Sequence, residues 1–357
     1  MRIVIDEKIP YLYQALLAMG NEVVCLPGAK ITTNDIKDAE ALFVRTRTKC
    51  DAELLNGTPV RFIGTATIGY DHIDAHYCAT HGIEWASAAG CNAGAVLQYV
   101  QSVIYLWAVN KGISLDGLVL GVVGVGEIGS RVAEWARSVG MRVLLNDPPR
   151  KAKGEDGFVG LDKIASLCDI ITFHPTLEKE GEFPSFHLAG GEFFESLDHC
   201  RLLINASRGP VVDNAALLWA INVGKVADAV LDVWENEPFI DMALLDKVYL
   251  ATPHIAGYSA EGKMNASRMM LDAFVRFSGY EGLVPELMLQ APVVSDIVAP
   301  DECAAYLEIY DPSVDSVALK SRPDDFELLR NEYNLRREPG AYRINILNRE
   351  NRKKLSF

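Results

Sequence analysis

The feature that most constrains the fold is an apolar run, a glycine-rich turn and a helical pattern that follow one another between residues 118 and 139. Residues 118–123 are typical of a buried strand. The motif G-x-G-x-x-G comes directly after them. The apolar stripe of the following helix then consists of Ile128, Val132, Trp135, Ala136 and Val139. Such a strand–turn–helix unit is typical of an open parallel sheet, so we expect a doubly wound α/β fold.

Short β-rich runs alternate with helical patterns along most of the 357 residues. A chain of this length exceeds what one hydrophobic core usually supports. We therefore predict two doubly wound parallel-sheet domains of the Rossmann or flavodoxin type, followed by a small α+β C-terminal domain. The expected strands are 2–6, 22–26, 41–44, 60–63, 118–123, 142–145, 170–173, 202–205, 229–231, 248–250 and 342–346.

Charge and cysteine content exclude several classes of protein. The formal net charge of −14 argues against nucleic-acid or anionic-membrane binding, so an anionic substrate requires a local cationic pocket. Seven widely spaced cysteines without a C-x-x-C pair predict buried thiols in a reducing compartment, with no metal site. No run predicts a membrane span, and the chain begins in a strand pattern with no signal-peptide features. We expect a cytoplasmic protein.

The glycine motif predicts a dinucleotide site because each glycine has a separate task. Gly124 permits the tight turn, Gly126 lets the backbone approach a pyrophosphate, and Gly129 allows close helix–strand packing. Asp147 ends the next strand, where its carboxylate suits a ribose and repels a 2′-phosphate, which favours NAD over NADP. The alternative is a glycine-rich turn that binds nothing. The expected cofactor contacts here are Gly124, Gly126, Glu127, Ile128, Gly129 and Asp147.

Three later motifs lie at or after strand ends and together supply what oxidation of a 2-hydroxy acid requires. Arg208 offers a planar charged fork for a carboxylate. His254 can take the hydroxyl proton, and Glu237 can orient its imidazole. Taken singly, each has a structural alternative: a surface ion pair, a loop acid or a core histidine. The motifs occupy residues 205–210, 232–238 and 252–257.

These motifs read N-x-x-R-G, D-V-x-x-x-E-P and T-P-H-x-A-G, and they follow the glycine motif in this order. On them, residues 1 to about 280 resemble the D-isomer-specific 2-hydroxyacid dehydrogenase family. The resemblance implies that Arg208 binds the substrate carboxylate, Glu237 supports the histidine and His254 is the acid/base. It also implies cofactor contacts at Ser207, Asp232 and Gly257.

The resemblance further implies how the chain is divided. A discontinuous substrate domain would comprise residues 1–92 and 254–284, and an NAD-binding Rossmann domain would comprise residues 93–253. Residues 285–357 would form a C-terminal dimerisation domain. The pattern departs from the family after the 170–173 strand, because His174 and Pro175 are adjacent here, where relatives usually have an intervening residue.

A narrower resemblance is to one branch of that family, through residues 44–46, 64–72, 89–93, 146–150, 254–263, 324–330 and 336–338. It implies a homodimer that oxidises 4-phospho-D-erythronate with NAD⁺ in pyridoxal phosphate biosynthesis. The phosphorylated substrate would contact Arg45, Thr46, Thr67 and Tyr258. Arg45 and its basic neighbours suit a phosphate, although they equally suit a solvated strand end.

Two other interpretations remain open from the sequence. One is a related dehydrogenase that acts on 3-phosphoglycerate, glyoxylate or hydroxypyruvate. The other is a dinucleotide-sensing, corepressor-like binding protein, which the joint presence of Arg208, Glu237 and His254 disfavours.

Overall fold

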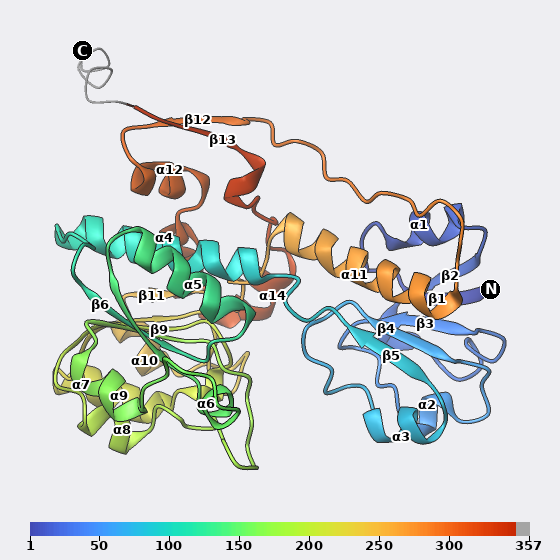
Figure 1. Ribbon diagram of the computed structural model, residues 1–357, viewed down its shortest axis with the longest axis horizontal. Helices are drawn as coiled ribbons and strands as arrows, with labels where there is room; N and C mark the ends of the chain where they lie inside the picture. Colours follow the sequence, from blue (N-terminus) through green and yellow to red (C-terminus); the bar gives the residue numbers. More distant parts are fainter. Residues whose placement is uncertain (348–357) are drawn as a thin grey trace. The chain divides into compact units, whose positions relative to one another are not determined.

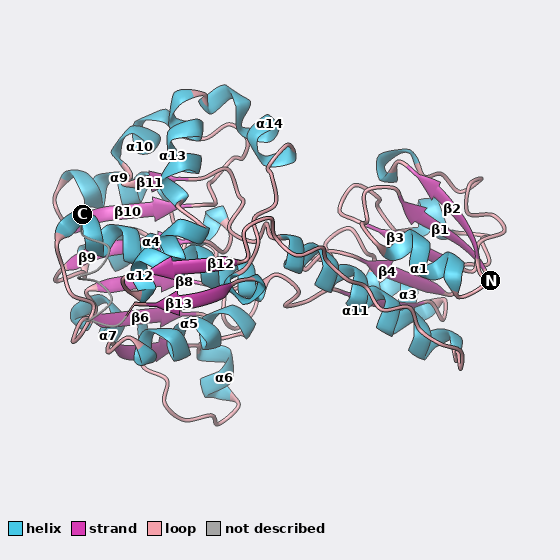
Figure 2. Cartoon of the chain, turned by 90° about the horizontal axis from the view of Figure 1, so that it is seen from above, coloured by secondary structure: helices cyan, strands magenta, loops and turns pink. Residues whose placement is uncertain are grey.

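The computed structural model describes residues 1–347, and the chain divides into two compact units (Figure 1). The first comprises Met1–Asn92 and Ser259–Ala291, and the second comprises Ala93–Tyr258 and the residues from Pro292 onward. Each unit is built around a parallel sheet with helices beside it, and Figure 2 shows these strands in magenta. The predicted α/β fold class is confirmed. No helix among residues 1–347 is both long and apolar enough to cross a membrane.

The first unit contains a five-stranded sheet with the order β2-β1-β3-β4-β5. Because the order changes direction between β1 and β3, the carboxyl ends of these two strands mark the place where sheets of this kind usually bind ligands. Its strands are β1 (Arg2–Asp6), β2 (Glu22–Leu26), β3 (Ala41–Val44), β4 (Phe62–Thr65) and β5 (Glu84–Ser87). Its helices are α1 (Leu12–Ala18), α2 (Ala52–Leu55), α3 (Ala75–Thr80) and α11 (Ala260–Ser278).

Aromatic side chains join α11 to the sheet of the first unit. Phe274 packs edge-on against Phe43 of β3 and Phe62 of β4, with ring centroids 5.7 Å and 5.9 Å away. The Ser259 hydroxyl accepts a hydrogen bond from the amide of Gly262 and so caps the start of α11. Residues that follow the 252–257 motif therefore return to the first unit.

The second unit contains a six-stranded parallel sheet with the order β11-β10-β9-β8-β6-β7. A parallel bridge between Leu145 and Phe158 adds one residue beyond β7. The change of direction lies between β6 and β8, so these two strand ends mark the expected ligand crevice. The strands are β6 (Val119–Val123), β7 (Arg142–Asn146), β8 (Ile170–Phe173), β9 (Cys200–Asn205), β10 (Val226–Leu231) and β11 (Leu250–Ala251).

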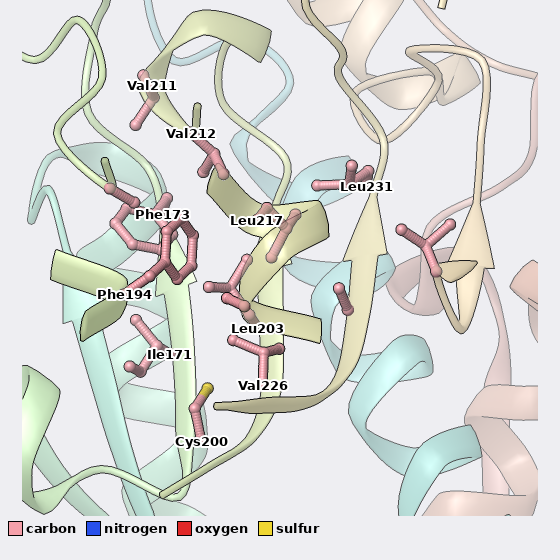
Figure 3. Packing of buried hydrophobic residues seen from close by; sticks show 14 of the residues in the cluster. Ile171, Phe173, Phe194, Cys200, Leu203, Val211, Val212, Leu217, Val226 and Leu231 are labelled. Atoms are coloured by element: carbon pink, nitrogen blue, oxygen red, sulfur yellow. The ribbon is translucent and has the colours of Figure 1, made fainter. Parts of the chain in front are cut away.

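Two hydrophobic clusters form the core of the second unit. One includes Phe173, Phe194, Leu217 and Leu231 and is drawn in Figure 3. The other includes Tyr99 and residues of the glycine-motif helix. The helices of residues 93–258 are α4 (Ala93–Lys111), α5 (Glu127–Ser138), α6 (Pro148–Ala152), α7 (Leu161–Leu167), α8 (Gly191–Glu195), α9 (Asn214–Asn222) and α10 (Met242–Lys247).

The C-terminal segment forms a short two-stranded sheet and three helices that are packed into the second unit. Leu319 and Phe326 are fully buried in the hydrophobic cluster of the second unit that includes Phe173, and Tyr310 is buried in the cluster that includes Tyr99. The separate domain at 285–357 therefore stays a prediction. The segment contains β12 (Asp296–Ala299), α12 (Glu302–Ile309), α13 (Pro312–Ser321), α14 (Phe326–Asn331) and β13 (Arg343–Ile346).

Local differences from the expectations have simple causes. The expected strand at 60–63 is shifted to Phe62–Thr65, because Val60 and Arg61 precede the residues that pair with β3. The edge strand Glu84–Ser87 and the strand Asp296–Ala299 were not predicted, since both are short and only partly apolar. Cys25 is exposed on β2, and Cys91 and Cys303 are only partly buried, so the expectation that the thiols are buried is correct for the other four cysteines and wrong for Cys25.

Candidate active site and cofactor-binding turn

The three motif glycines occupy three different environments at the end of β6. Gly124 has a φ of +83°, and a Cβ atom there would overlap the backbone of Pro175 and lie 2.7 Å from the carbonyl carbon of His174. A Cβ atom on Gly129 would overlap the carbonyl oxygen of Gly124. A Cβ atom on Gly126 would meet nothing within 4 Å. The turn therefore needs two glycines for its own packing and leaves open space at the third.

The open space at Gly126 lies at the start of α5, where the helix presents its first amide groups. Gly126 is the N-cap residue and has no side chain to occupy these amides. Glu127 and Ile128 follow in the first turn, and the exposed Glu127 carboxylate lies 3.7 Å from Arg131. Free amides and the positive end of a helix bind phosphate groups. The residues present thus suit a dinucleotide pyrophosphate.

Asp147 lies beside the same turn, as the sequence predicts. One carboxylate oxygen accepts a hydrogen bond from the amide of Val125 (2.8 Å), and the other accepts one from the amide of Arg150 (3.0 Å). The Arg150 side chain in turn donates to the carbonyl oxygen of Val125 at 2.7 Å. The glycine turn and the carboxylate are therefore held together as one site at the end of β6 and β7.

The loop after β8 is joined to the 232–238 motif by His187. Its Nε2 atom lies 2.7 Å from Glu235, and its Nδ1 atom lies 3.5 Å from Asp213. Among residues 1–347, these three side chains form a group of the types that bind metal ions. Because one ring nitrogen of His187 faces Glu235 and the other faces Asp213, the imidazole connects the loop after β8 to the loops that contain these two carboxylates. At the start of this loop, burial lowers the pKa of His174 to about 3, so that imidazole is neutral.

The structure brings His254 and Glu237 together, as predicted. His254 Nδ1 lies 2.8 Å from Glu237 Oε2, and the other carboxylate oxygen accepts from the amide of Trp234 at 2.8 Å. Burial acts to raise the pKa of Glu237. The hydrogen bond and charge of His254, the Trp234 amide and the Arg330 guanidinium at 4.0 Å outweigh it and lower that pKa below its usual value. The carboxylate therefore stays ionised beside the imidazole.

Asp232 lies beneath the His254 loop with both carboxylate oxygens engaged by this chain. One oxygen accepts from the Thr252 hydroxyl (2.7 Å) and the Ile255 amide (2.8 Å), and the other accepts from the Ala256 amide (2.9 Å). Its side chain is 1% exposed, and burial raises its pKa. The His254 amide donates to the Asp232 carbonyl oxygen at 2.7 Å, and His254 has a φ of 58°. Asp232 thus fixes a loop whose histidine has a left-handed backbone conformation.

Arg208 lies on a loop that packs directly against the loop of Glu237. A Cβ atom on Gly209 would overlap the carbonyl oxygen of Trp234, so the two backbones are in contact. The Arg208 side chain is exposed, and its Nη1 atom donates to the carbonyl oxygen of Ser207 at 2.8 Å. Ser207 is buried, and its hydroxyl donates to Asn205 at 2.8 Å. Arg208, Glu237 and His254 therefore project from neighbouring loops at one edge of the second sheet.

The other predicted substrate residues lie at strand ends of the first unit. Arg45 follows β3, and its Nε atom donates to the carboxylate of Asp6 at the end of β1 (3.1 Å). The Asp6 side chain is fully buried. Thr46 is exposed, and the Thr67 hydroxyl lies 2.6 Å from that of Thr65 and donates to the carbonyl of Gly69. Asp6 was not predicted as a partner, although an aspartate that ends the first strand was available as an indication.

Two arginines of the C-terminal segment also reach the predicted site and were not predicted to do so. Arg330 of α14 donates to the hydroxyl of Tyr258 at 3.2 Å. Arg336 donates to the backbone of the loop that contains Gly257 and Tyr258. Both arginines lie in stretches that carry the narrower resemblance, 324–330 and 336–338, but nothing in these stretches indicates which residues they bind.

Comparison with known proteins agrees with this geometry. The model of the D-isomer specific 2-hydroxyacid dehydrogenase NAD binding domain matches residues 98–256. Erythronate-4-phosphate dehydrogenase of Bacteroides thetaiotaomicron is 51% identical over 345 residues, which are 96% of this chain and 99% of that protein. The protein of the same name from Proteus mirabilis is 42% identical over 96% of this chain and 94% of its own length.

A solved structure with the same fold is D-lactate dehydrogenase from Aquifex aeolicus, complexed with NAD and lactic acid. It is 27% identical, with a TM-score of 0.58, over 78% of this chain and 96% of that chain. The glycine turn, Arg208, Glu237 and His254 all lie within the residues matched by the NAD-binding model.

Proposed function

This chain belongs to the D-isomer-specific 2-hydroxyacid dehydrogenase family, and we propose that it oxidises 4-phospho-D-erythronate with NAD⁺. It is an NAD-dependent dehydrogenase. The observation that carries the proposal is the His254–Glu237 pair, which follows strands of the same sheet as the glycine turn in a chain 51% identical to an erythronate-4-phosphate dehydrogenase. The product is (R)-3-hydroxy-2-oxo-4-phosphooxybutanoate, which places the reaction in pyridoxal 5′-phosphate biosynthesis.

The chemistry of the hydroxyl group is assigned to His254. The ring nitrogen that faces Glu237 is Nδ1, so Nε2 is the atom that accepts the hydroxyl proton. Bound NAD⁺ supplies the hydride acceptor. As the O–H proton moves to Nε2 and the C2–H hydrogen leaves as hydride, the carbon–oxygen single bond becomes a carbonyl. The ionised Glu237 stabilises the imidazolium that forms.

Substrate orientation is assigned to two groups of residues. Arg208 binds the carboxylate, because its planar fork makes paired hydrogen bonds with two oxygens. Arg45, Thr46, Thr67 and Tyr258 are assigned to the phosphorylated end. The Asp6 ion pair uses the Nε atom of Arg45, which leaves the two terminal nitrogens as the phosphate donors that we propose.

For the cofactor, we assign the pyrophosphate to the turn between Gly124 and Gly129, through the amides of Gly126, Glu127 and Ile128, and the adenosine ribose to Asp147. Their support is the open space at Gly126 and the placement of Asp147 beside Val125. Ser207, Asp232 and Gly257 are assigned to the nicotinamide end. Asp232 acts there through the loop backbone that its carboxylate holds.

We also propose a homodimer that forms through the C-terminal segment. The support is a set of exposed apolar side chains on this segment, among them Val314 and Val317 of α13, each 67% exposed. These two residues are three positions apart and so share one face of the helix. A cytoplasmic location and the absence of nucleic-acid binding belong to the same proposal, with the net charge of −14 as support for the second.

The test is a comparison of turnover with phosphorylated and unphosphorylated three- and four-carbon 2-hydroxy acids. We expect the highest kcat/KM for 4-phospho-D-erythronate. A higher kcat/KM for 3-phosphoglycerate, or for unphosphorylated erythronate, would reassign the substrate within the family. NAD⁺ binding without turnover of any of these acids would favour a dinucleotide-sensing protein.

A further inference from the structure

Arg336 has the densest set of hydrogen bonds around the catalytic loop, although it lies in the C-terminal segment. Its side chain is buried, with 8% relative exposure. The Nη1 atom donates to the carbonyl oxygens of Ile255 (2.9 Å) and Tyr258 (3.1 Å), and Nη2 donates to that of Ala256. Three carbonyl groups of the four residues that follow His254 are therefore bound by one guanidinium.

The same guanidinium is anchored to α4 at the other side. Nη2 also donates to the carbonyl oxygen of Ala95 (2.9 Å), and Nε donates to the Gln98 side chain (3.1 Å). The Gln98 amide in turn donates to the carbonyl oxygen of Arg337 at 3.0 Å. Arg336 thus links the loop after His254 to a long helix of the second unit.

Asp232 and Arg336 hold opposite polar groups of the peptide unit between Ile255 and Ala256. The Asp232 carboxylate accepts from the N–H of this unit, and Arg336 donates to its C=O. The peptide units on either side are each held at one group, by Asp232 at the Ile255 amide and by Arg336 at the Ala256 carbonyl. A peptide that is bound at its N–H and at its C=O cannot rotate without breaking both hydrogen bonds. The backbone immediately after His254 is therefore restrained from two sides.

The surroundings of Arg336 explain how a positive charge is kept in this position. The Tyr310 ring lies 4.4 Å from the guanidinium carbon, within the range of a cation–π contact. Burial acts against the charge, and the negative groups Asp232 and Asp315 act in its favour. A lysine has its three donors on one nitrogen atom, whereas the three nitrogen atoms of Arg336 donate both to α4 and to the loop after His254. A lysine cannot make all of these hydrogen bonds, so the position requires arginine.

We propose that Arg336 is a positioning residue for His254, and that the C-terminal segment is thereby part of the catalytic apparatus. Arg336 acts through the loop backbone, and its hydrogen bonds do not include the side chain of His254 or that of Glu237. This inference rests on the proposed role of His254 as proton acceptor. A displacement of about 1 Å in a reacting group can lower the rate about 10²-fold, so loss of these hydrogen bonds is expected to act on kcat.

The test uses Arg336→Lys, which keeps the charge, and Arg336→Met, which removes the charge at similar length. The control is Arg343→Met, because Arg343 is an exposed arginine of the same segment that pairs with Asp296. We expect kcat to fall about 10²-fold in Arg336→Met and less in Arg336→Lys, with NAD⁺ affinity within about twofold of the parent. Arg343→Met is expected to keep the parental kcat.

Hydrogen exchange of the backbone amides supplies a readout that does not depend on turnover. In Arg336→Lys, exchange should increase in the 252–258 peptide and stay unchanged in peptides from β6 to β8. Unchanged exchange at 252–258, or a kcat within twofold of the parent in Arg336→Met, would overturn the proposal. An increase spread evenly over the second unit would also overturn it, since that result indicates general destabilisation.

The two proposals fail in distinguishable ways. If the parent protein does not oxidise 4-phospho-D-erythronate, the substrate assignment fails, and kcat is then measured on whichever 2-hydroxy acid the protein oxidises. If the parent is active and the arginine variants are equally active, only the positioning role fails. If Arg336→Met does not fold, Arg336→Lys and its exchange pattern decide the question.

Discussion

His254 Nδ1 and Glu237 Oε2 lie 2.8 Å apart, and this single hydrogen bond determines which ring nitrogen can serve the reaction. An ionised carboxylate is only an acceptor, so Nδ1 carries the proton and Nε2 is left as the base. The backbone of His254 has a left-handed conformation, with a φ of 58°. Such a conformation costs of order 1–3 kcal/mol for a residue other than glycine, and the surrounding loop must supply that stabilisation.

Replacement of His254 by Asn should reduce kcat by roughly 10²–10⁴-fold, because no group remains at the loop to accept the hydroxyl proton. Asparagine tolerates a left-handed backbone, so the fold should be preserved. The variant should still bind NAD⁺, as measured by the quenching of protein fluorescence. Near-normal turnover in this variant would exclude His254 as the base.

Replacement of Glu237 by Gln should lower kcat and make the stability difference from the parent depend on pH. The pKa of Glu237 is lowered in the fold, so its ionised form stabilises the protein above the unfolded value of about 4.3. That contribution is lost as the pH falls through the folded pKa. The difference in Tm should therefore be largest above about pH 5 and shrink in acid. A difference that grows in acid would contradict the direction of the shift.

Replacement of Asp147 by Asn or Ala should weaken the preference for NAD⁺ over NADP⁺, because the charge that repels a 2′-phosphate is removed. The two variants separate this role from a structural one. Asp147 caps α6 by accepting from the Arg150 amide, and asparagine can keep that hydrogen bond whereas alanine cannot. Asp147→Ala should lose about 1 kcal/mol more stability than Asp147→Asn, because asparagine keeps one of the two amide hydrogen bonds of Asp147 and alanine keeps neither. Equal cofactor ratios in all three proteins would count against the ribose assignment.

Alanine substitutions at Gly124 and Gly126 should have different effects. Gly126→Ala places a methyl group in open space, so Tm should be unchanged while NAD⁺ binding weakens about tenfold or more, equivalent to ~1.4 kcal/mol. Gly124→Ala forces a methyl group onto the 174–175 backbone at a positive φ and should lower Tm by several degrees. Full NAD⁺ affinity in Gly126→Ala would place the pyrophosphate elsewhere.

Replacement of Val314 and Val317 together by Asp should convert the proposed dimer into a monomer, as measured by light scattering. Both side chains are exposed, so the change should not affect the core. Deletion of the whole C-terminal segment is a poorer test, because Leu319 and Phe326 are buried in the second unit and the deletion would expose its interior. A dimer that persists in the double variant would assign the interface to another surface.

The elements with a strong periodic pattern were predictable. The strands 2–6, 22–26, 41–44 and 170–173 have the bounds expected from the sequence, since each is an apolar run between turn residues. The glycine motif and Asp147 were also placed together correctly, because a parallel sheet brings the ends of adjacent strands to one edge. Neighbouring motifs after strands of the same sheet share that edge, which is why His254 and Glu237 could be paired.

The parts that the sequence did not predict depend on contacts across long stretches of chain. Arg336 and Ala95 are separated by 241 positions, and no local pattern indicates that one binds the other. The role that the sequence predicts for Asp232 also differs from the contacts that the structure shows, because its hydrogen-bond partners lie in a later loop of the chain. A strand-end aspartate is expected to face a ligand, and only the fold shows that its oxygens are occupied by the amides of residues 255 and 256.

The guanidinium of Arg336 has a consequence for protein engineering. A chimera that keeps this histidine loop but has a tail without arginine at this position leaves three carbonyl groups of the loop without their donor. Each such acceptor that stays buried costs about 1–3 kcal/mol. The tail and the loop therefore have to be exchanged together if the loop is to keep its shape.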